Sequence, residues 1–139
     1  MWWGSWLLVL AAAVAALAAL ASPALASPCS FNSMCTCKDK EVACVGVPFH
    51  HLPELPHEPL EHLDVVRAGL PWLENDALGG VRVASLRLMS NSLQRVAPRA
   101  FSSLADDLRS LDLSYNLLDE VPLHAMERLV NLDWFNLHG

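Results

Sequence analysis

Apolar residues recur along residues 60–139 with a period of 23 to 25 residues. The segment that starts at Leu108 matches the pattern L-x-x-L-x-L-x-x-N-x-L at every position, and the segment that starts at Val83 matches it with Val in the first place. The framework residues of the two units are Leu86, Leu88 and Asn91, then Leu111, Leu113 and Asn116. Four units follow from this spacing: 60–82, 83–107, 108–131 and the partial unit 132–139.

The second half of each unit repeats as well. Counted from Leu70, Leu93 and Leu118, small or apolar residues stand at offsets of +3, +7, +8 and +11 in all three units. Each unit carries a small residue followed by a larger one, as in Ala100-Phe101. This pair is typical of a short helix or turn on the outer side of each coil.

The L-x-L part of the pattern predicts a short strand. Its two Leu side chains share one face of the strand because side chains alternate with a period of two, and an amphipathic helix would need a period of 3.6. The Asn can bond backbone groups of the turn that follows, which would otherwise be buried without partners. A single unit cannot cover its own Leu face, so neighbouring units must stack. The predicted fold is an α/β solenoid, a right-handed coil with short parallel strands on its concave face.

The N-terminal segment 1–26 has the pattern of a secretory signal peptide. An almost wholly apolar run from Trp6 to Ala21 leads to the small-residue triplet Ala24-Leu25-Ala26, after which we expect cleavage. The first charged side chain is Lys38, so the segment lacks the basic residues that usually precede such a run. An uncleaved signal anchor is the alternative, although the run is short for the ~20 residues of a membrane span.

All four cysteines lie between positions 29 and 44, just after the expected cleavage site. An even number of cysteines in an exported chain predicts two disulfides, and four cysteines allow three pairings. Zinc is a poorer interpretation because structural zinc sites usually pair their ligands as C-x2-C. The segment 27–59 is rich in Pro and stands where a solenoid needs a cap over its open apolar end, so we predict a cysteine-rich N-terminal cap there.

Charge and motifs exclude several functions. The chain has 15 acidic and 9 basic residues, a net charge of −6, which disfavours a nucleic acid partner. No nucleophile motif, phosphate loop or metal-ligand set occurs, and the adjacent His50 and His51 would diverge in extended chain. We therefore predict no enzyme activity, no small-molecule substrate, no cofactor and no metal. No second apolar run is long enough to cross a membrane, so membrane association would require an anchor downstream.

The cysteine spacing C-x5-C-x-C-x6-C, followed by Val47-Pro48 and Leu52-Pro53, resembles the N-terminal cap of extracellular leucine-rich-repeat proteins. The units with Ala-Phe in their second half resemble the typical extracellular subclass, and the segment 29–37 resembles chaoptin-type arthropod adhesion proteins. The resemblance implies the disulfides Cys29–Cys37 and Cys35–Cys44. It also implies a secreted or cell-surface location and protein binding, in cell adhesion or in a receptor ectodomain.

The chain departs from the family pattern at two points. Ala68 replaces the Asn of the first unit, which predicts a looser turn there. No C-terminal cap follows the last repeat, so we expect a fragment of a longer protein in which residue 140 is Asn and further units follow. A secreted structural component of the extracellular matrix, or a truncated product without a function of its own, are the alternative interpretations.

The side chains between the framework leucines point out of the concave face, where we expect the binding site. The central outward column consists of Asp64, Arg87, Asp112 and Asn136. The expected contact residues for an extracellular protein, either a second copy of this chain or a different one, are Arg87, Met89, Asp112, Tyr115 and Trp134. The structural alternative for the charges is a cross-strand ladder of Asp64, Arg87 and Asp112 that stabilises the sheet.

Overall fold

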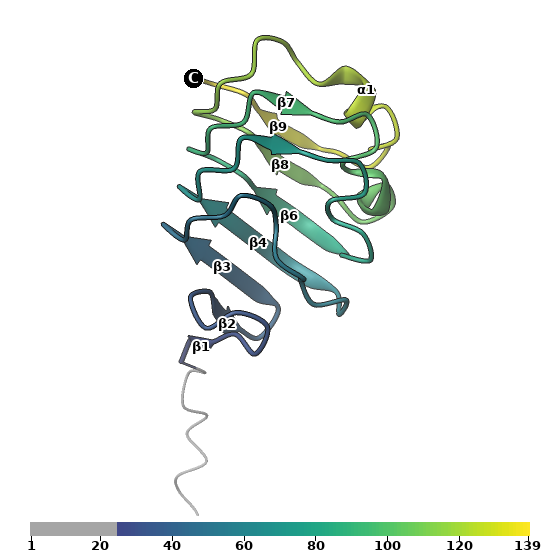
Figure 1. The fold of residues 1–139 in the computed structure, drawn as a ribbon. Helices are drawn as coiled ribbons and strands as arrows, with labels where there is room; N and C mark the ends of the chain where they lie inside the picture. The colour runs from purple at the N-terminus through teal and green to yellow at the C-terminus, as the bar shows by residue number, and fades with distance from the viewer. Residues whose placement is uncertain (1–24) are drawn as a thin grey trace, which may run out of the picture.

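The computed structural model describes residues 25–139, so the predicted signal peptide lies outside the described residues except for Leu25 and Ala26. These residues form a coil with a seven-stranded sheet in the order β1-β2-β3-β4-β6-β8-β9. Figure 1 shows the strands stacked one above another from β3 to β9. The strands of this sheet are β1 (Ser27–Pro28), β2 (Thr36–Lys38), β3 (Glu41–Val45), β4 (Leu60–Val66), β6 (Val83–Arg87), β8 (Ser110–Asp112) and β9 (Trp134–Asn136).

The five strands from β3 to β9 are parallel and in register. Leu63 of β4 pairs with Leu86 of β6, which pairs with Leu111 of β8, which pairs with Phe135 of β9. Each strand therefore occupies the equivalent position in its own turn of the coil, as the L-x-L spacing predicts. The predicted solenoid with short parallel strands is confirmed.

The outer side of the coil carries a smaller sheet, short helices and turns. Strands β5 (Trp72–Leu73) and β7 (Arg95–Val96) pair in parallel, and this second sheet was not predicted from the sequence. The 3-10 helix η1 (Ser102–Leu104) and the helix α1 (Leu123–Met126) follow the small-plus-large pairs or contain them. At the equivalent place in the first unit the chain forms turns only, over residues 75–80.

The core runs through the inside of the coil as one continuous cluster. Leu63, Leu86 and Leu111 have no exposed surface, and the convex-side residues Ala100 and Phe101 are equally buried. Burying a Leu side chain contributes about 1.5–3 kcal/mol, so the column of leucines supplies much of the driving force for stacking. The core extends into the cap, where Val42 and Cys44 belong to the same cluster.

Asn91 and Asn116 join successive coils through their side-chain amides. The Asn91 amide donates to the carbonyls of Val65 and Leu88, and its oxygen accepts from the backbone N–H of Ala68 at 2.8 Å. The Asn116 amide donates to the carbonyls of Leu88 and Leu113, and its oxygen accepts from the N–H of Leu93. Backbone groups of the turn, which water does not reach, are thus paired, as the sequence predicts.

The residue before each of these positions has a left-handed backbone. The φ angles are 53° at Arg67, 54° at Ser90 and 54° at Tyr115, and the cap residue Gly46 has the same conformation at 70°. Because Arg67 matches the later turns, the looser turn expected beside Ala68 is not observed. Asn91 and Asn116 each donate to the carbonyl three residues before them, and an Asn at 68 would donate to Val65 in the same way. The Asn91 amide of the next coil donates to that Val65 carbonyl instead, so it is paired without an Asn at 68.

Two disulfides hold the cap together. Cys29 bonds Cys37 and Cys35 bonds Cys44, which is the pairing that the family resemblance implied. Cys44 lies in β3, and β3 pairs with β4 in parallel over five residues. The cap therefore continues the sheet of the repeats and covers the first coil with a covalently closed segment.

Replacing Leu111 with Asp is expected to abolish secretion of the chain, because a charge would enter the shared core without a partner. Leu117→Asp is the matched control, since the Leu117 side chain is 57% exposed. Immunoblots of medium and cell lysate measure the secreted fraction of each variant. Normal secretion of the Leu111→Asp variant would show that the register of the repeats is wrong.

Replacing Asn91 with Ala is expected to lower the free energy of unfolding by about 2–4 kcal/mol, because buried backbone groups of two coils lose their partners. Asn131→Ala removes one bond between coils, from the Asn131 amide to the Asp106 carbonyl, at the protein surface. That control should cost less than about 1 kcal/mol. Urea denaturation followed by circular dichroism measures both, and equal losses would contradict the role given to Asn91.

Candidate protein-binding face

The register of the parallel sheet places outward side chains of successive coils next to one another. One column runs through Ala43, Asp64, Arg87, Asp112 and Asn136. A second column runs through Glu41, His62, Ser85, Ser110 and Trp134. These side chains come from residues distant in sequence and together form one surface, which we call the concave face.

Trp134 is the large aromatic residue of the second column. Its side chain is 49% exposed, and its register partner on the neighbouring strand is the small residue Ser110. Next to Ser110 in the same column is Ser85, so the two positions that precede Trp134 in this column both carry small side chains. An exposed Trp beside small residues can be buried by a partner, and Trp is among the residues that most often dominate interface energies.

Arg87 lies at the centre of the first column. Its guanidinium bonds the Asp64 carboxylate of the preceding strand at 3.2 Å, and its side chain remains 54% exposed. Such an exposed ion pair stabilises the fold by at most about 1 kcal/mol. Arg87 is thus oriented by Asp64 and is still accessible, which suits a contact residue.

Asp112, which the sequence pattern places among the contact residues, is instead buried, with 8% of its surface exposed. One carboxylate oxygen accepts from the backbone N–H and the hydroxyl of Ser114, at 2.9 and 2.5 Å. The same oxygen is 3.4 Å from the Asn136 amide. The carboxylate therefore organises the end of β8, and Asp112 does not belong to the accessible surface.

The predicted charge ladder forms only in part for the same reason. Arg87 pairs with Asp64 on one side, and among residues 25–139 no salt bridge joins Arg87 to Asp112 on the other. The spacing Asp-x-Ser in 112–114 is the signal that could have identified this turn from the sequence, because Asp side chains often bond the backbone two residues later. Asn136 uses its side chain in the same way, accepting from the N–H of His138.

The remaining two predicted contact residues occupy different parts of the face. Met89 is half-buried beyond the end of β6, so it offers only part of its side chain. Tyr115 is 57% exposed and packs edge-to-face on His138, with ring centroids 5.6 Å apart. The sequence did not indicate this aromatic pair, because it depends on the turn that places residue 115 beside the next coil.

Tyr115 and Trp134 are not brought together. Trp134 is level with Ser110 in the sheet, whereas Tyr115 lies beyond the end of β8, in the turn that follows Asp112. The concave face therefore has an aromatic group at each end, with Arg87 between them along the neighbouring strand. A partner would have to cover the width of the sheet to contact all three.

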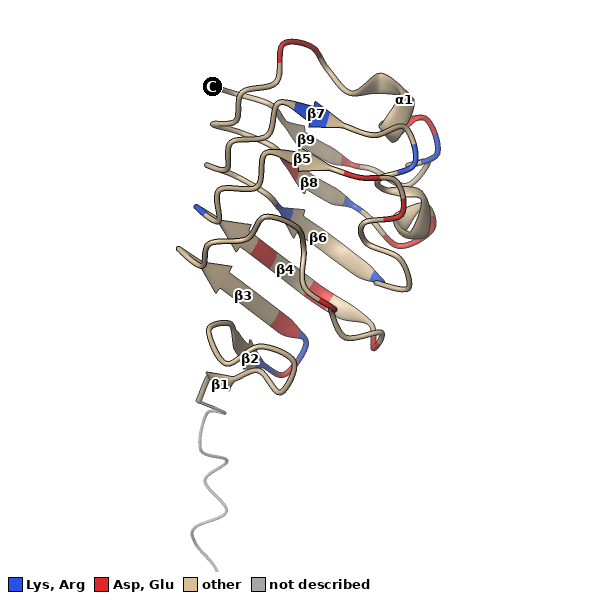
Figure 2. Cartoon of the chain, viewed as in Figure 1, with Lys and Arg blue, Asp and Glu red and all other residues tan. Residues whose placement is uncertain are grey.

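No group of three or more His, Cys, Asp or Glu side chains that could hold a metal ion occurs within residues 25–139. Lys and Arg are scattered among Asp and Glu in the view of Figure 2 and do not gather on the sheet. No helix within the part of the chain that the structure describes is long and apolar enough to span a membrane.

Comparison with known proteins agrees with this architecture. Residues 81–139 match the leucine-rich repeat family. Chaoptin from Drosophila melanogaster is 30% identical over 116 residues, which cover 79% of this chain and 9% of that protein. Leucine-rich repeat-containing protein 3 from Danio rerio is 29% identical over 129 residues, or 82% of this chain and 43% of that protein.

The chain thus spans less than half the length of either relative. The match to the family covers the later coils, and the relatives extend the similarity over most of the chain. The parallel strands in register and the two disulfides before them add the structural evidence. Residues 81–139 are therefore leucine-rich repeats, and the same coil of parallel strands continues back to the disulfide-bonded segment 29–44.

Proposed function

We propose that the concave face binds an extracellular protein, and that the chain serves cell adhesion or the ectodomain of a receptor. The observation that carries the proposal is that inward side chains of the strands are buried while outward ones are exposed. Inward residues such as Leu86 and Leu111 are fully buried, while Arg87 and Trp134 on the opposite side are about half exposed. The fold does not need these outward side chains for its core.

The location follows from the cap. Two disulfides close residues 29–44, and disulfides form and persist in the secretory pathway and outside the cell. The predicted signal peptide and the resemblance to chaoptin-type adhesion proteins support the same location. No second function is favoured by a separate observation on this face.

The size and chemistry of the face suit a protein partner. The outward columns span five strands spaced about 4.8 Å apart, which gives a broad, continuous surface. Protein interfaces use broad surfaces of this kind, whereas small molecules bind in concave pockets that enclose them. Arg and Trp are the enriched anchor residues of such interfaces, and both are present here.

The partner can be found with the full chain displayed as an oligomer and screened against a panel of secreted and cell-surface ectodomains that includes the chain itself. For the partner so found, Trp134→Ala is expected to weaken binding by about 2 kcal/mol, or roughly 30-fold, because an interface Trp is lost. Biolayer interferometry with purified proteins measures the affinities.

Two control variants test the location of the site. Trp72→Ala removes a Trp of similar exposure, 45%, from the flank of the coil, and Arg128→Glu matches Arg87→Glu outside the sheet. Both controls should leave the affinity within about twofold, while Arg87→Glu should reduce it about tenfold. If Trp72→Ala abolished binding and Trp134→Ala did not, the partner would occupy the flank and the proposal would be wrong.

A further inference from the structure

The third coil separates from the second along one flank of the solenoid. Strands β5 and β7 form a sheet of two strands, so β7 has one edge without a strand beside it. The Leu117 N–H still donates to the Leu93 carbonyl at 2.8 Å. Beyond that bond, no backbone hydrogen bond within the described residues joins 118–122 to 94–98.

Pro122 removes one of the donors that could join the two coils here. In the second coil the Ala97 N–H donates to the Leu73 carbonyl of β5 at 2.8 Å, which ties the two coils together. Ala97 follows Asn91 by six residues, and Pro122 follows Asn116 by the same number. Proline has no N–H to donate, and its fixed φ suits the start of a helix, so the chain turns into α1 at Leu123. The outer edge of β7 is left unpaired.

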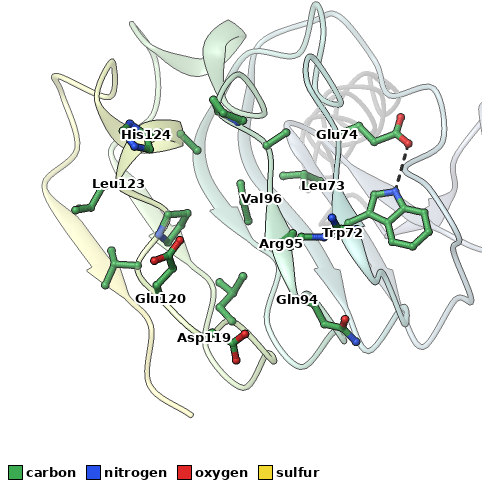
Figure 3. A pocket seen from close by; sticks show the side chains of 16 residues that line it. Trp72, Leu73, Glu74, Gln94, Arg95, Val96, Asp119, Glu120, Leu123 and His124 are labelled. Atoms are coloured by element: carbon green, nitrogen blue, oxygen red, sulfur yellow. Dashed lines mark hydrogen bonds between the residues drawn. The ribbon is translucent and has the colours of Figure 1, made fainter.

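A groove lies between β7 and the segment 118–125. Its volume is about 840 Å³, and Val96 and Leu118 supply its partly buried apolar lining. Figure 3 shows Arg95 and Val96 between Trp72 on one side and Glu120 and Leu123 on the other. The rims are apolar and accessible, since Trp72 is 45%, Val121 42% and Leu123 66% exposed.

The charges around the groove are mainly acidic. Glu74, Asp119 and Glu120 line it together with Arg95, and within residues 25–139 none of these four takes part in a salt bridge. The Glu74 carboxylate accepts only from the Trp72 indole N–H, at 3.3 Å. His124 faces its own neighbour Glu127 at 3.1 Å. Carboxylates without a cationic partner beside an apolar surface are complementary to a basic ligand that has apolar side chains.

We propose that this groove binds an extended, basic segment of a partner protein, which adds as a strand beside β7. The unpaired edge supplies backbone hydrogen bonds, as in other cases of strand addition. Alternate side chains of the bound segment would enter between Val96 and Val121 and pack against these apolar side chains. Lys or Arg side chains of the segment would lie against Asp119 and Glu120. This flank site is separate from the concave face and does not depend on the function proposed for it.

A synthetic peptide of alternating Lys and Val, labelled with a fluorophore, probes the site in the full chain. Fluorescence anisotropy measures its affinity, and hydrogen exchange with mass spectrometry locates the contact. Strand addition should slow amide exchange in residues 94–98, because the edge becomes hydrogen-bonded. A peptide of alternating Glu and Val should bind at least about tenfold more weakly, because its charges repel the groove.

Two comparisons distinguish specific binding of the peptide in the groove from non-specific attraction of a basic peptide to an acidic protein. The double variant Asp119→Lys, Glu120→Lys should weaken binding about tenfold. The double variant Glu54→Lys, Glu58→Lys makes the same change of charge within the cap and should have little effect. Two further Lys-Val peptides, N-methylated at every Val or at every Lys, test the backbone bonds. Alternate residues of a strand donate to opposite sides, so the peptide that lacks the N–H groups facing β7 should lose affinity.

The proposal is overturned if no peptide binds, if the Glu-Val peptide binds as well as the Lys-Val peptide, or if both double variants lose affinity equally. Undiminished binding of both N-methylated peptides would also overturn it, because strand addition requires the backbone donors on one side of the segment. Slower exchange in the strands of the concave face and not in residues 94–98 would place the ligand elsewhere and would count against the flank site.

Discussion

The structure depends on each coil returning to the same register as the one before it. Leu63, Leu86 and Leu111 can share one core only if the strands that carry them start level. The side-chain amides of Asn91 and Asn116 fix this register, since each bonds backbone groups of its own coil and of the preceding one. Apolar burial drives the stacking, and these directional bonds fix the register of each coil against the preceding one.

The inward half of the fold could be predicted from the sequence because it depends on periodicity. Leu86 and Leu111 had to be buried once the strand period was established, and the buried turns required Asn91 and Asn116. The disulfide pairing could not be derived from spacing alone and came from the family resemblance. Periodicity carries no information about outward residues, whose positions depend on local turns and on neighbouring coils.

Asp112 and Tyr115 show why part of the candidate site could not be predicted. Both stand at outward positions of the pattern, yet the Asp112 side chain folds down onto Ser114 and Tyr115 packs on His138. The first effect is a local turn that a closer reading of Asp-x-Ser could have indicated. The second is a contact between residues 23 positions apart, which required the coils to be placed. Arg87, Trp134 and Tyr115 remain exposed, so the concave face retains one cation and an aromatic group at each end.

The flank illustrates how a single missing donor can change a repeat without breaking the solenoid. The concave sheet of the third coil stays in register, because Leu113 and Tyr115 still donate to the carbonyls of Asn136 and His138. Pro122 lacks a donor only on the outer side, where Ala97 of the preceding coil has one. The inner half of the coil therefore keeps its bonds to the next coil, while the outer half lacks them. A repeat built in this way can present two independent surfaces, one on the concave face and one along the unpaired strand β7.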